Sequence, residues 1–273
     1  MKKTLIKQHG LSLIELMLAM TLGLFVIIGI SYVYISGKKT SMTTDQVSLL
    51  QENGRAVLQQ LTDSIQHGGY SAASAAPFDD VFIRSAVAST SCSDGTDSVV
   101  DPGLFSAMTN NTTYGDSVGV VYMSDDSINT DCAGSTIPPV CRLGSDSSSD
   151  ASKIYNQFFV APDADGTPVL NCNGSRTVGT QVIAEGVENI QFVYGEDLDA
   201  DGVADHYVNL TDVADWKDVV SVNISVLIRS LNPVAAANTP RSYQLSEDTV
   251  VNRNDRYLRS VFTATVRLRN VIL

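Results

Sequence analysis

One short stretch of the chain carries acidic residues at alternate positions. Its sequence is Asp197-x-Asp199-x-Asp201-Gly202-Val203-x-Asp205, which matches the first nine positions of a calcium-binding loop. Alternate carboxylates in a coiled loop can turn toward one centre, the glycine permits a sharp turn, and the valine can offer its backbone carbonyl. We therefore expect a calcium site whose ligands are Asp197, Asp199, Asp201, Val203 and Asp205.

This loop lacks one feature of a strong calcium site. Its twelfth position is Val208, where an EF-hand has a bidentate glutamate. Another acid, such as Glu196, Asp212 or Asp215, would have to reach in, and we expect an affinity of about 10⁻⁴ to 10⁻³ M. The alternative is a turn whose acidic side chains are solvated. A second stretch, Asp163 to Gly166, has only two acids and predicts a plain hairpin turn.

A possible nucleophile motif occurs at Gly115-Asp116-Ser117-Val118-Gly119, which has the G-x-S-x-G pattern of esterases. That motif needs a strand before the serine and a helix after it, whereas here the motif opens a predicted strand. The histidines are only His9, His67 and His206, and none has a suitable place in the sequence. We therefore predict that the chain is not an enzyme, with a membrane-tethered hydrolase as a remote alternative.

Four cysteines lie in the part of the chain beyond the apolar N-terminal segment: Cys92, Cys132, Cys141 and Cys172. An even number in an exported chain predicts two disulfides, and no C-x-x-C spacing supports a zinc site. Three pairings are possible, and the sequence does not choose among them. Free buried thiols are the alternative.

The N-terminal segment has basic residues first, then Gly10, then an apolar run that reaches Ile35. A secretory signal would place its cleavage site after the apolar core, whereas cutting at Gly10 removes the charges and keeps the hydrophobic segment. The run is long enough to span a membrane, and its only charge is Glu15. An acid retained at such a position is expected to have a function. The alternative is an ordinary single-span anchor that tolerates it.

Composition limits the possible partners. The formal charge is −12, and loss of the three lysines before Gly10 makes it −15, which argues against nucleic acid. Three lysines precede the apolar run and two follow it, which weakly favours a cytoplasmic N-terminus.

Apolar periodicity predicts the elements that position these residues. A helical face continues beyond the membrane segment at steps of three and four, through Val47, Leu50, Gly54, Val57, Leu58, Leu61 and Ile65. Gly68-Gly69 predicts its C-cap, so residues 11 to 67 form one helix or two helices with a hinge near Gly37. Strands are predicted at Ser117–Met123, Ile154–Val160, Gln181–Tyr194, Asp218–Ser230 and Ser260–Asn270. In the strand Asp218–Ser230, the alternation of apolar and polar residues predicts one buried face. Apart from the predicted strands, residues 71 to 175 are predicted to be mostly long loops.

The N-terminal arrangement resembles the class III signal of type IV pilins, and further motifs narrow the resemblance to PilW-type minor pilins. These motifs are Leu50-Gln51-Glu52-Asn53-Gly54-Arg55, the Gly68-Gly69-Tyr70 exit, Leu227-Ile228-Arg229-Ser230, and Phe262 to Asn270. The resemblance implies that prepilin peptidase cuts between Gly10 and Leu11, that Leu11 is N-methylated, and that Glu15 orders subunits during assembly. Leu11 replaces the usual phenylalanine, and no proline near Tyr32 kinks the helix.

The resulting fold prediction is α+β: a long N-terminal helix packed on an antiparallel sheet with long loops, as in the pilin fold. The expected parts are a leader (1–10), a transmembrane half-helix (11–36), an amphipathic half-helix (37–70) and a β-rich domain (71–273). The resemblance implies an inner-membrane protein that then enters a pilus near its tip. Its expected partners are minor pilins, the major pilin and a tip adhesin, with roles in assembly, adhesion or twitching motility. The alternative within similar machinery is a minor pseudopilin of a type II secretion system.

Overall fold

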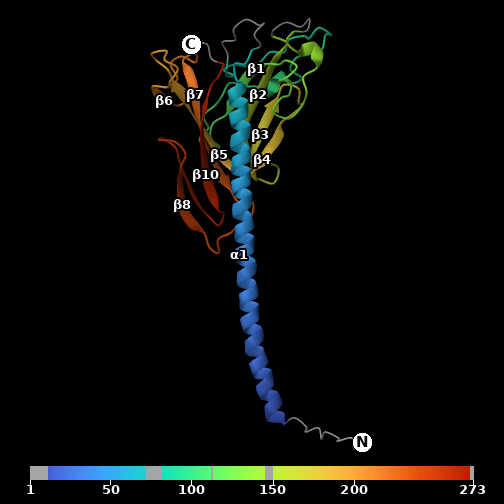
Figure 1. The fold of residues 1–273 in the computed structure, drawn as a ribbon, viewed down its shortest axis with the longest axis vertical. Helices are drawn as coiled ribbons and strands as arrows, with labels where there is room; N and C mark the ends of the chain where they lie inside the picture. The colour runs from blue at the N-terminus through green and yellow to red at the C-terminus, as the bar shows by residue number, and fades with distance from the viewer. Residues whose placement is uncertain (1–11, 72–80, 112, 145–149, 271–273) are drawn as a thin grey trace, which may run out of the picture. The chain divides into compact units, whose positions relative to one another are not determined.

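The computed structural model describes residues 12–71, 81–111, 113–144 and 150–270. The chain divides into two compact units, Met1–Asp45 and Gln46–Leu273. One helix, α1 (Leu13–His67), extends through the first unit into the second (Figure 1). The predicted α+β fold, a long N-terminal helix packed on antiparallel β-structure, is confirmed, but the described strands form more than the one predicted sheet.

Helix α1 is continuous over 55 residues, about 83 Å at about 1.5 Å per residue. Gly37 lies inside it, so the alternative with two helices and a hinge is wrong. The helix ends as predicted at the glycine pair, because Gly69 has φ +73° and the Tyr70 N–H donates to the carbonyl of His67 at 2.9 Å. A left-handed residue at this point favours glycine.

In the first unit, the helix exposes its large apolar side chains. From Leu13 to Ile35 these side chains are 52% to 76% exposed, and the segment is long and apolar enough to cross a membrane. A water-soluble helix does not expose such an apolar surface all round, so this segment is suited to an apolar environment.

The second unit contains two four-stranded antiparallel sheets. The first has the order β1-β2-β3-β4, with strands β1 (Val118–Met123), β2 (Lys153–Pro162), β3 (Pro168–Gly174) and β4 (Gln181–Glu185). The second has the order β10-β7-β5-β6, with strands β5 (Val187–Glu196), β6 (His206–Val208), β7 (Val219–Arg229) and β10 (Arg259–Arg267). The loops also hold two short 3-10 helices, Pro102–Leu104 and Pro139–Cys141.

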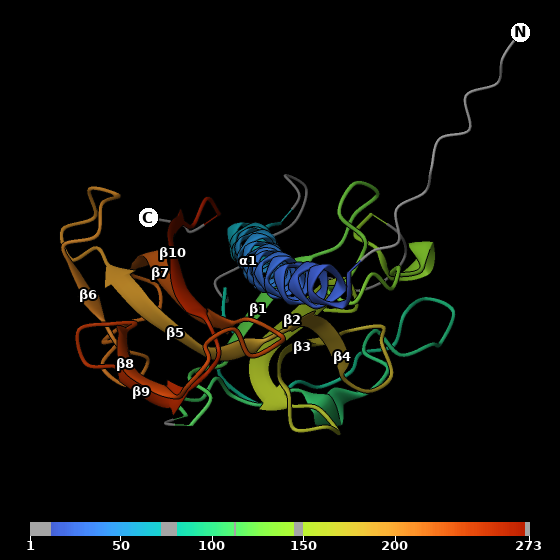
Figure 2. The same cartoon turned by 90° about the horizontal axis from the view of Figure 1, so that it is seen from below.

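A separate hairpin, β8 (Thr239–Gln244) with β9 (Val250–Asp255), covers the face of the second sheet away from α1 (Figure 2). Its Leu245 and Val251 pack on Leu227 of β7 and Val261 of β10. The predicted buried face of β7 is confirmed, and part of its second face is buried as well, because the hairpin covers it.

The prediction of one strand over Gln181–Tyr194 is wrong, because this stretch forms two strands. Gly186 has φ +78° and separates β4 from β5, which belong to different sheets. The other four predicted strands are confirmed to within a few residues, and Asp163–Gly166 forms the β2–β3 turn, with Gly166 at φ +78°.

The Gln46–His67 part of α1 packs on the concave side of both sheets (Figure 2). Its buried positions follow the predicted periodicity: Leu50, Gly54, Val57, Leu61, Ser64 and Ile65. Leu61 and Ile65 are fully buried, and each contributes about 1.5 to 3 kcal/mol by burial. This packing holds the exit of α1 against β1, where the Gly69 N–H donates to the carbonyl of Val121.

Candidate functional site

The predicted processing site lies at the start of the chain. Gly10 and Leu11 are outside the described residues. Glu15 lies in the first turn of α1, among exposed apolar side chains. An acid there interacts favourably with the positive N-terminal end of the helix dipole, and the residues on either side of it in the sequence, Ile14 and Leu16, are apolar.

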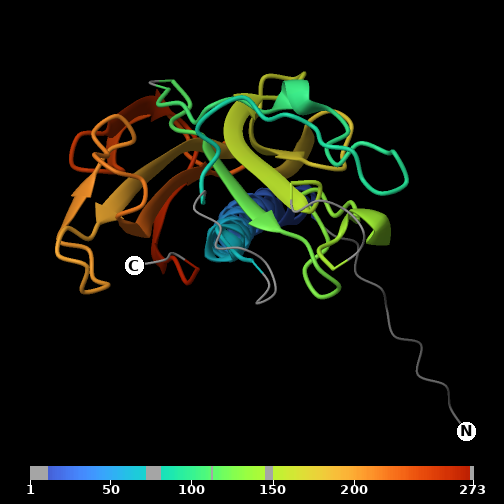
Figure 3. The same cartoon turned by 90° about the horizontal axis from the view of Figure 1, so that it is seen from above.

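The acidic loop connects β5 to β6 at the outer edge of the second sheet (Figure 3). Oxygens of Asp197, Asp199 and Asp205 all lie within 4.8 Å of one another, close enough to share one cation. The loop turns sharply at Ala200 (φ +62°) and Gly202 (φ +83°). The structure therefore brings three of the predicted acidic ligands together.

The other predicted ligands have different surroundings. The carboxylate of Asp201 accepts the Val203 N–H at 2.8 Å and is not one of the three converging acids. Val203 itself is exposed. Val208, at the twelfth position, pairs with Tyr194 in the sheet, so this position supplies no side-chain ligand.

Backbone hydrogen bonds and the repulsion between carboxylates shift the pKa values of this loop in opposite directions. Burial disfavours a charged Asp197, but the N–H groups of Gly202 (2.7 Å) and Asp201 (3.2 Å) outweigh it and lower the pKa of Asp197. The charge of Asp201, followed by those of Asp205 and Asp197, raises the pKa of Asp199. A divalent cation would relieve this repulsion.

Glu196 does not reach into the loop as a further ligand. Its Oε1 accepts the N–H groups of Ala214 (2.8 Å) and Asp215 (3.2 Å), and its Oε2 lies 3.1 Å from Nε2 of His206. Glu196 is 1% exposed, so these contacts satisfy a buried carboxylate. Its role in this structure is to hold the segment after β6 against β5.

The four cysteines form two disulfides, Cys92–Cys141 and Cys132–Cys172, with Cα–Cα distances of 4.9 and 6.3 Å. The pair that would close the shortest loop, Cys132 with Cys141, does not form. Both bonds join loops of the first half of the β-rich unit to its core, since Cys92, Cys141 and Cys172 are buried. Polar loops that bury little apolar surface need such links.

Ser117 is not placed as a nucleophile. It is 6% exposed, its Oγ accepts the Thr109 N–H at 2.8 Å, and β1 rather than a helix follows it. His206, one of the two histidines in the described residues, is paired with Glu196. The G-x-S-x-G pattern here forms a strand start without the geometry of a nucleophile elbow.

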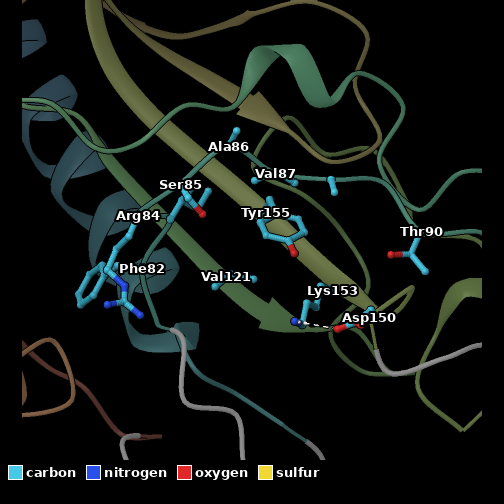
Figure 4. Close-up of a pocket in the computed structure, with 12 residues that line it drawn as sticks. Phe82, Arg84, Ser85, Ala86, Val87, Thr90, Val121, Asp150, Lys153 and Tyr155 are labelled. Atoms are coloured by element: carbon cyan, nitrogen blue, oxygen red, sulfur yellow. Dashed lines mark ion pairs between the residues drawn. The ribbon is translucent and has the colours of Figure 1, made fainter.

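A cavity of about 340 Å³ lies between the segment that begins at Phe82 and the first sheet (Figure 4). Lys153 points toward Asp150, with Nζ 2.9 Å from Oδ1, and Tyr155 also lines the cavity. None of the residues predicted for a site is among the twelve that line it. The cavity is therefore separate from the predicted sites.

Two family comparisons agree with this arrangement. Residues 157–270 match the family described as Type IV Pilus-assembly protein W, and residues 5–31 match the prokaryotic N-terminal methylation motif. No curated protein and no solved structure matches the chain. The first match extends from β2 to the end of the last strand, and the second includes Gly10, Leu11 and Glu15.

Proposed function

We propose that this chain, a type IV minor pilin of the PilW type, joins other minor pilins at or near the pilus tip and primes assembly. One observation carries the proposal. The N-terminal methylation motif includes the start of α1, and α1 continues from there into a β-rich unit. A segment this apolar needs lipid before assembly and neighbouring helices after it. The class III signal and the apolar helix fit an inner-membrane anchored pilin.

The processing step gives Glu15 its role. Cleavage after Gly10 would leave a free amino group at Leu11, four residues before the carboxylate of Glu15. A carboxylate in lipid is stabilised by a positive charge at a similar depth, and the new amino terminus of a neighbouring subunit supplies one. This pairing would set the axial position of each incoming subunit.

Native cells provide the test of processing and assembly. Mass spectrometry should find a mature chain beginning at methylated Leu11, and a bulky residue in place of Gly10 should leave the precursor in the membrane. Glu15→Val should insert normally, because it removes an acid from lipid, but should be lost from sheared pili. Glu52→Val, which removes an exposed acid farther along α1, is the matched control. Normal piliation and incorporation of Glu15→Val would contradict the proposed role.

The same cells separate the pilus from the secretion role. A deletion should reduce surface pili, adhesion and twitching motility while leaving type II secretion unchanged. The PilW match does not favour the pseudopilin alternative. Recovery of the chain with secretion components and its absence from sheared pili would contradict the pilus role. Expected partners are the other minor pilins, the major pilin and a tip adhesin, with the domain periplasmic and then extracellular.

A second proposal is that calcium binds the acidic loop through Asp197, Asp199 and Asp205, with Asp201 and the Val203 carbonyl joining on binding. It is supported by the three carboxylates that converge within 4.8 Å. Bound calcium would tie β5 to β6 and remove the mutual repulsion of the acids. At ten times a dissociation constant of about 10⁻³ M, calcium would stabilise the fold by about 1.4 kcal/mol.

Thermal unfolding of the fragment Gln46–Leu273 tests the calcium site. Its melting temperature should rise in calcium but much less in magnesium at equal ionic strength, since charge screening would act equally for both. Asp199→Asn should remove the calcium-specific rise, whereas Asp165→Asn in the exposed β2–β3 turn should not. Equal melting temperatures in calcium and in chelator would show that the loop is a solvated turn.

A further inference from the structure

Positive charge is concentrated at the C-terminal end of this acidic chain. Residues 219–273 contain seven arginines and three acidic residues, whereas residues 71–218 contain five basic and 23 acidic residues. Five of the seven arginines lie on or beside the β8–β9 hairpin and the adjoining ends of β7 and β10. We call them the arginine cluster: Arg229, Arg241, Arg253, Arg256 and Arg259.

Two acids inside the cluster, Glu188 and Asp255, both pair with Arg259. The side chain of Arg259 donates to Glu188 from Nε (2.7 Å) and Nη2 (2.8 Å), and to Asp255 from Nη1 (2.7 Å) and Nη2 (2.6 Å). Glu188 also lies within 4.0 Å of Arg229 and Arg253. This buried network fixes the floor of the cluster, because charged groups taken out of water must remain paired.

The remaining charge faces outward. Arg241 and Arg256 are exposed, and neither forms an ion pair within the described part of the chain. Together with Tyr243, Tyr257 and Arg259, they line a cavity of about 130 Å³. Five arginines against two acids leave the cluster with three positive charges in excess.

We propose that the arginine cluster binds a carboxylate side chain of a neighbouring pilin subunit. The inference rests on the proposed function, which supplies that neighbour. Arginine binds carboxylates through two parallel hydrogen bonds, and the exposed guanidinium groups of Arg241 and Arg256 have no carboxylate partner among the described residues. The small cavity accommodates a single acidic side chain, whereas a flat lipid surface would contact only the rim.

Zero-length crosslinking in native pili tests this contact. Arg241→Lys and Arg256→Lys keep the positive charge and introduce an amine, which a carbodiimide couples only to a carboxylate in direct contact. The resulting amide loses one water, so mass spectrometry identifies both joined peptides. We expect each lysine to be coupled to an aspartate or glutamate of another pilin subunit. Arg267→Lys and Arg269→Lys, on exposed positions outside the cluster, are the controls and should remain uncoupled.

Charge reversal gives an independent measurement. Arg241→Glu combined with Arg256→Glu should lower co-purification with other pilins at least tenfold, because it places acids against the partner's acid. Arg267→Glu combined with Arg269→Glu changes the net charge equally and should have little effect.

The outcomes separate this inference from the proposed function. Absence of the wild-type chain from pili would refute the proposed function. If wild-type enters pili but the two lysines stay uncoupled or couple only within their own chain, the inference alone is overturned. If the cluster instead faces lipid phosphates, the two lysines will stay uncoupled, because carbodiimide does not join such phosphates to lysine in this way.

Discussion

Asp116 gives the β-rich unit a pH-dependent stability that can be measured directly. Asp116 is 4% exposed, and its Oδ2 accepts the Phe192 N–H at 2.9 Å, while Oδ1 is buried and has no hydrogen-bond partner among the described residues. Burial raises the pKa of Asp116 from 3.8 to about 6, although the hydrogen bond from Phe192 opposes the change. The segment before β1 is therefore attached to β5 by a group that is unfavourable when charged.

The sign of the effect follows from the direction of this shift. Because the pKa of Asp116 is higher in the folded state than in the unfolded state, folded protein holds the proton more tightly. The contribution of Asp116 to stability is complete below about pH 4 and is lost as the pH rises through about 6. A difference of roughly two pKa units, at about 1.4 kcal/mol each, amounts to about 3 kcal/mol.

The substitution Asp116→Asn isolates this contribution. Asparagine has the shape and neutrality of the protonated acid and still accepts the Phe192 N–H, so the variant should match wild-type near pH 4. At pH 7.5 it should be more stable by up to about 3 kcal/mol, because wild-type must bury a charge there.

Urea unfolding of the Gln46–Leu273 fragment, with its disulfides intact, measures the difference at both pH values. Other carboxylates titrate in the same range, but their effect cancels when variant and wild-type are compared at each pH. Asp165→Asn, at an exposed turn, is the control and should track wild-type at both values. Equal pH dependence of Asp116→Asn and wild-type would refute the reasoning.

Two further predictions concern the links that hold α1 and the loops to the sheets. Replacing Cys132 and Cys172 by alanine removes a bond between residues 40 apart in sequence, and should cost about 4 kcal/mol in urea unfolding; an unchanged midpoint would contradict this. A Cβ on Gly54 would overlap the Phe262 ring, so Gly54→Ala should destabilise by about 1 to 3 kcal/mol despite its better helix propensity. Combining it with Phe262→Leu should cost less than the sum of the single changes, and strict additivity would show that the two side chains are not in conflict.

Local periodicity predicted the elements whose signal lies within a few residues. The buried face of α1 from Leu50 to Ile65 repeats every three to four residues, and the glycine pair that ends the helix is adjacent to it. β7 and β10 alternate in the same local way. These features were predictable because each depends on neighbours along the chain and on a continuous apolar face.

The division into two sheets depends on contacts that periodicity does not encode. Gly186 separates β4 from β5, and a glycine in the middle of a predicted strand was the available signal for that break. No comparable signal showed that the β8–β9 hairpin would cover the second face of β7. The hairpin strands are mostly exposed and polar, and Tyr243, Leu245 and Val251 anchor them.

How well a candidate site could be predicted also depends on how far apart its residues lie in the sequence. The spacing of Asp197, Asp199 and Asp205 predicted their convergence because all three lie in one loop. The same spacing could not show that Asp201 turns toward Val203, which depends on the backbone conformation around Gly202. Disulfide pairing was undetermined because it depends on how the loops cross the first sheet.

Periodicity could not predict the ion-pair network around Arg259, but the uneven distribution of charge along the sequence points to it. Glu188 and Arg259 are 71 residues apart, and only the pairing of β5 with β7 and of β7 with β10 brings them together. However, seven arginines within the last 55 residues of a strongly acidic chain are visible in the sequence. Such segregation brings like charges together and is unfavourable unless acids inside the fold or on a partner offset it. Glu188 and Asp255 offset part of it, and the excess that remains at Arg241 and Arg256 is the physical reason to look for the rest on a neighbouring subunit.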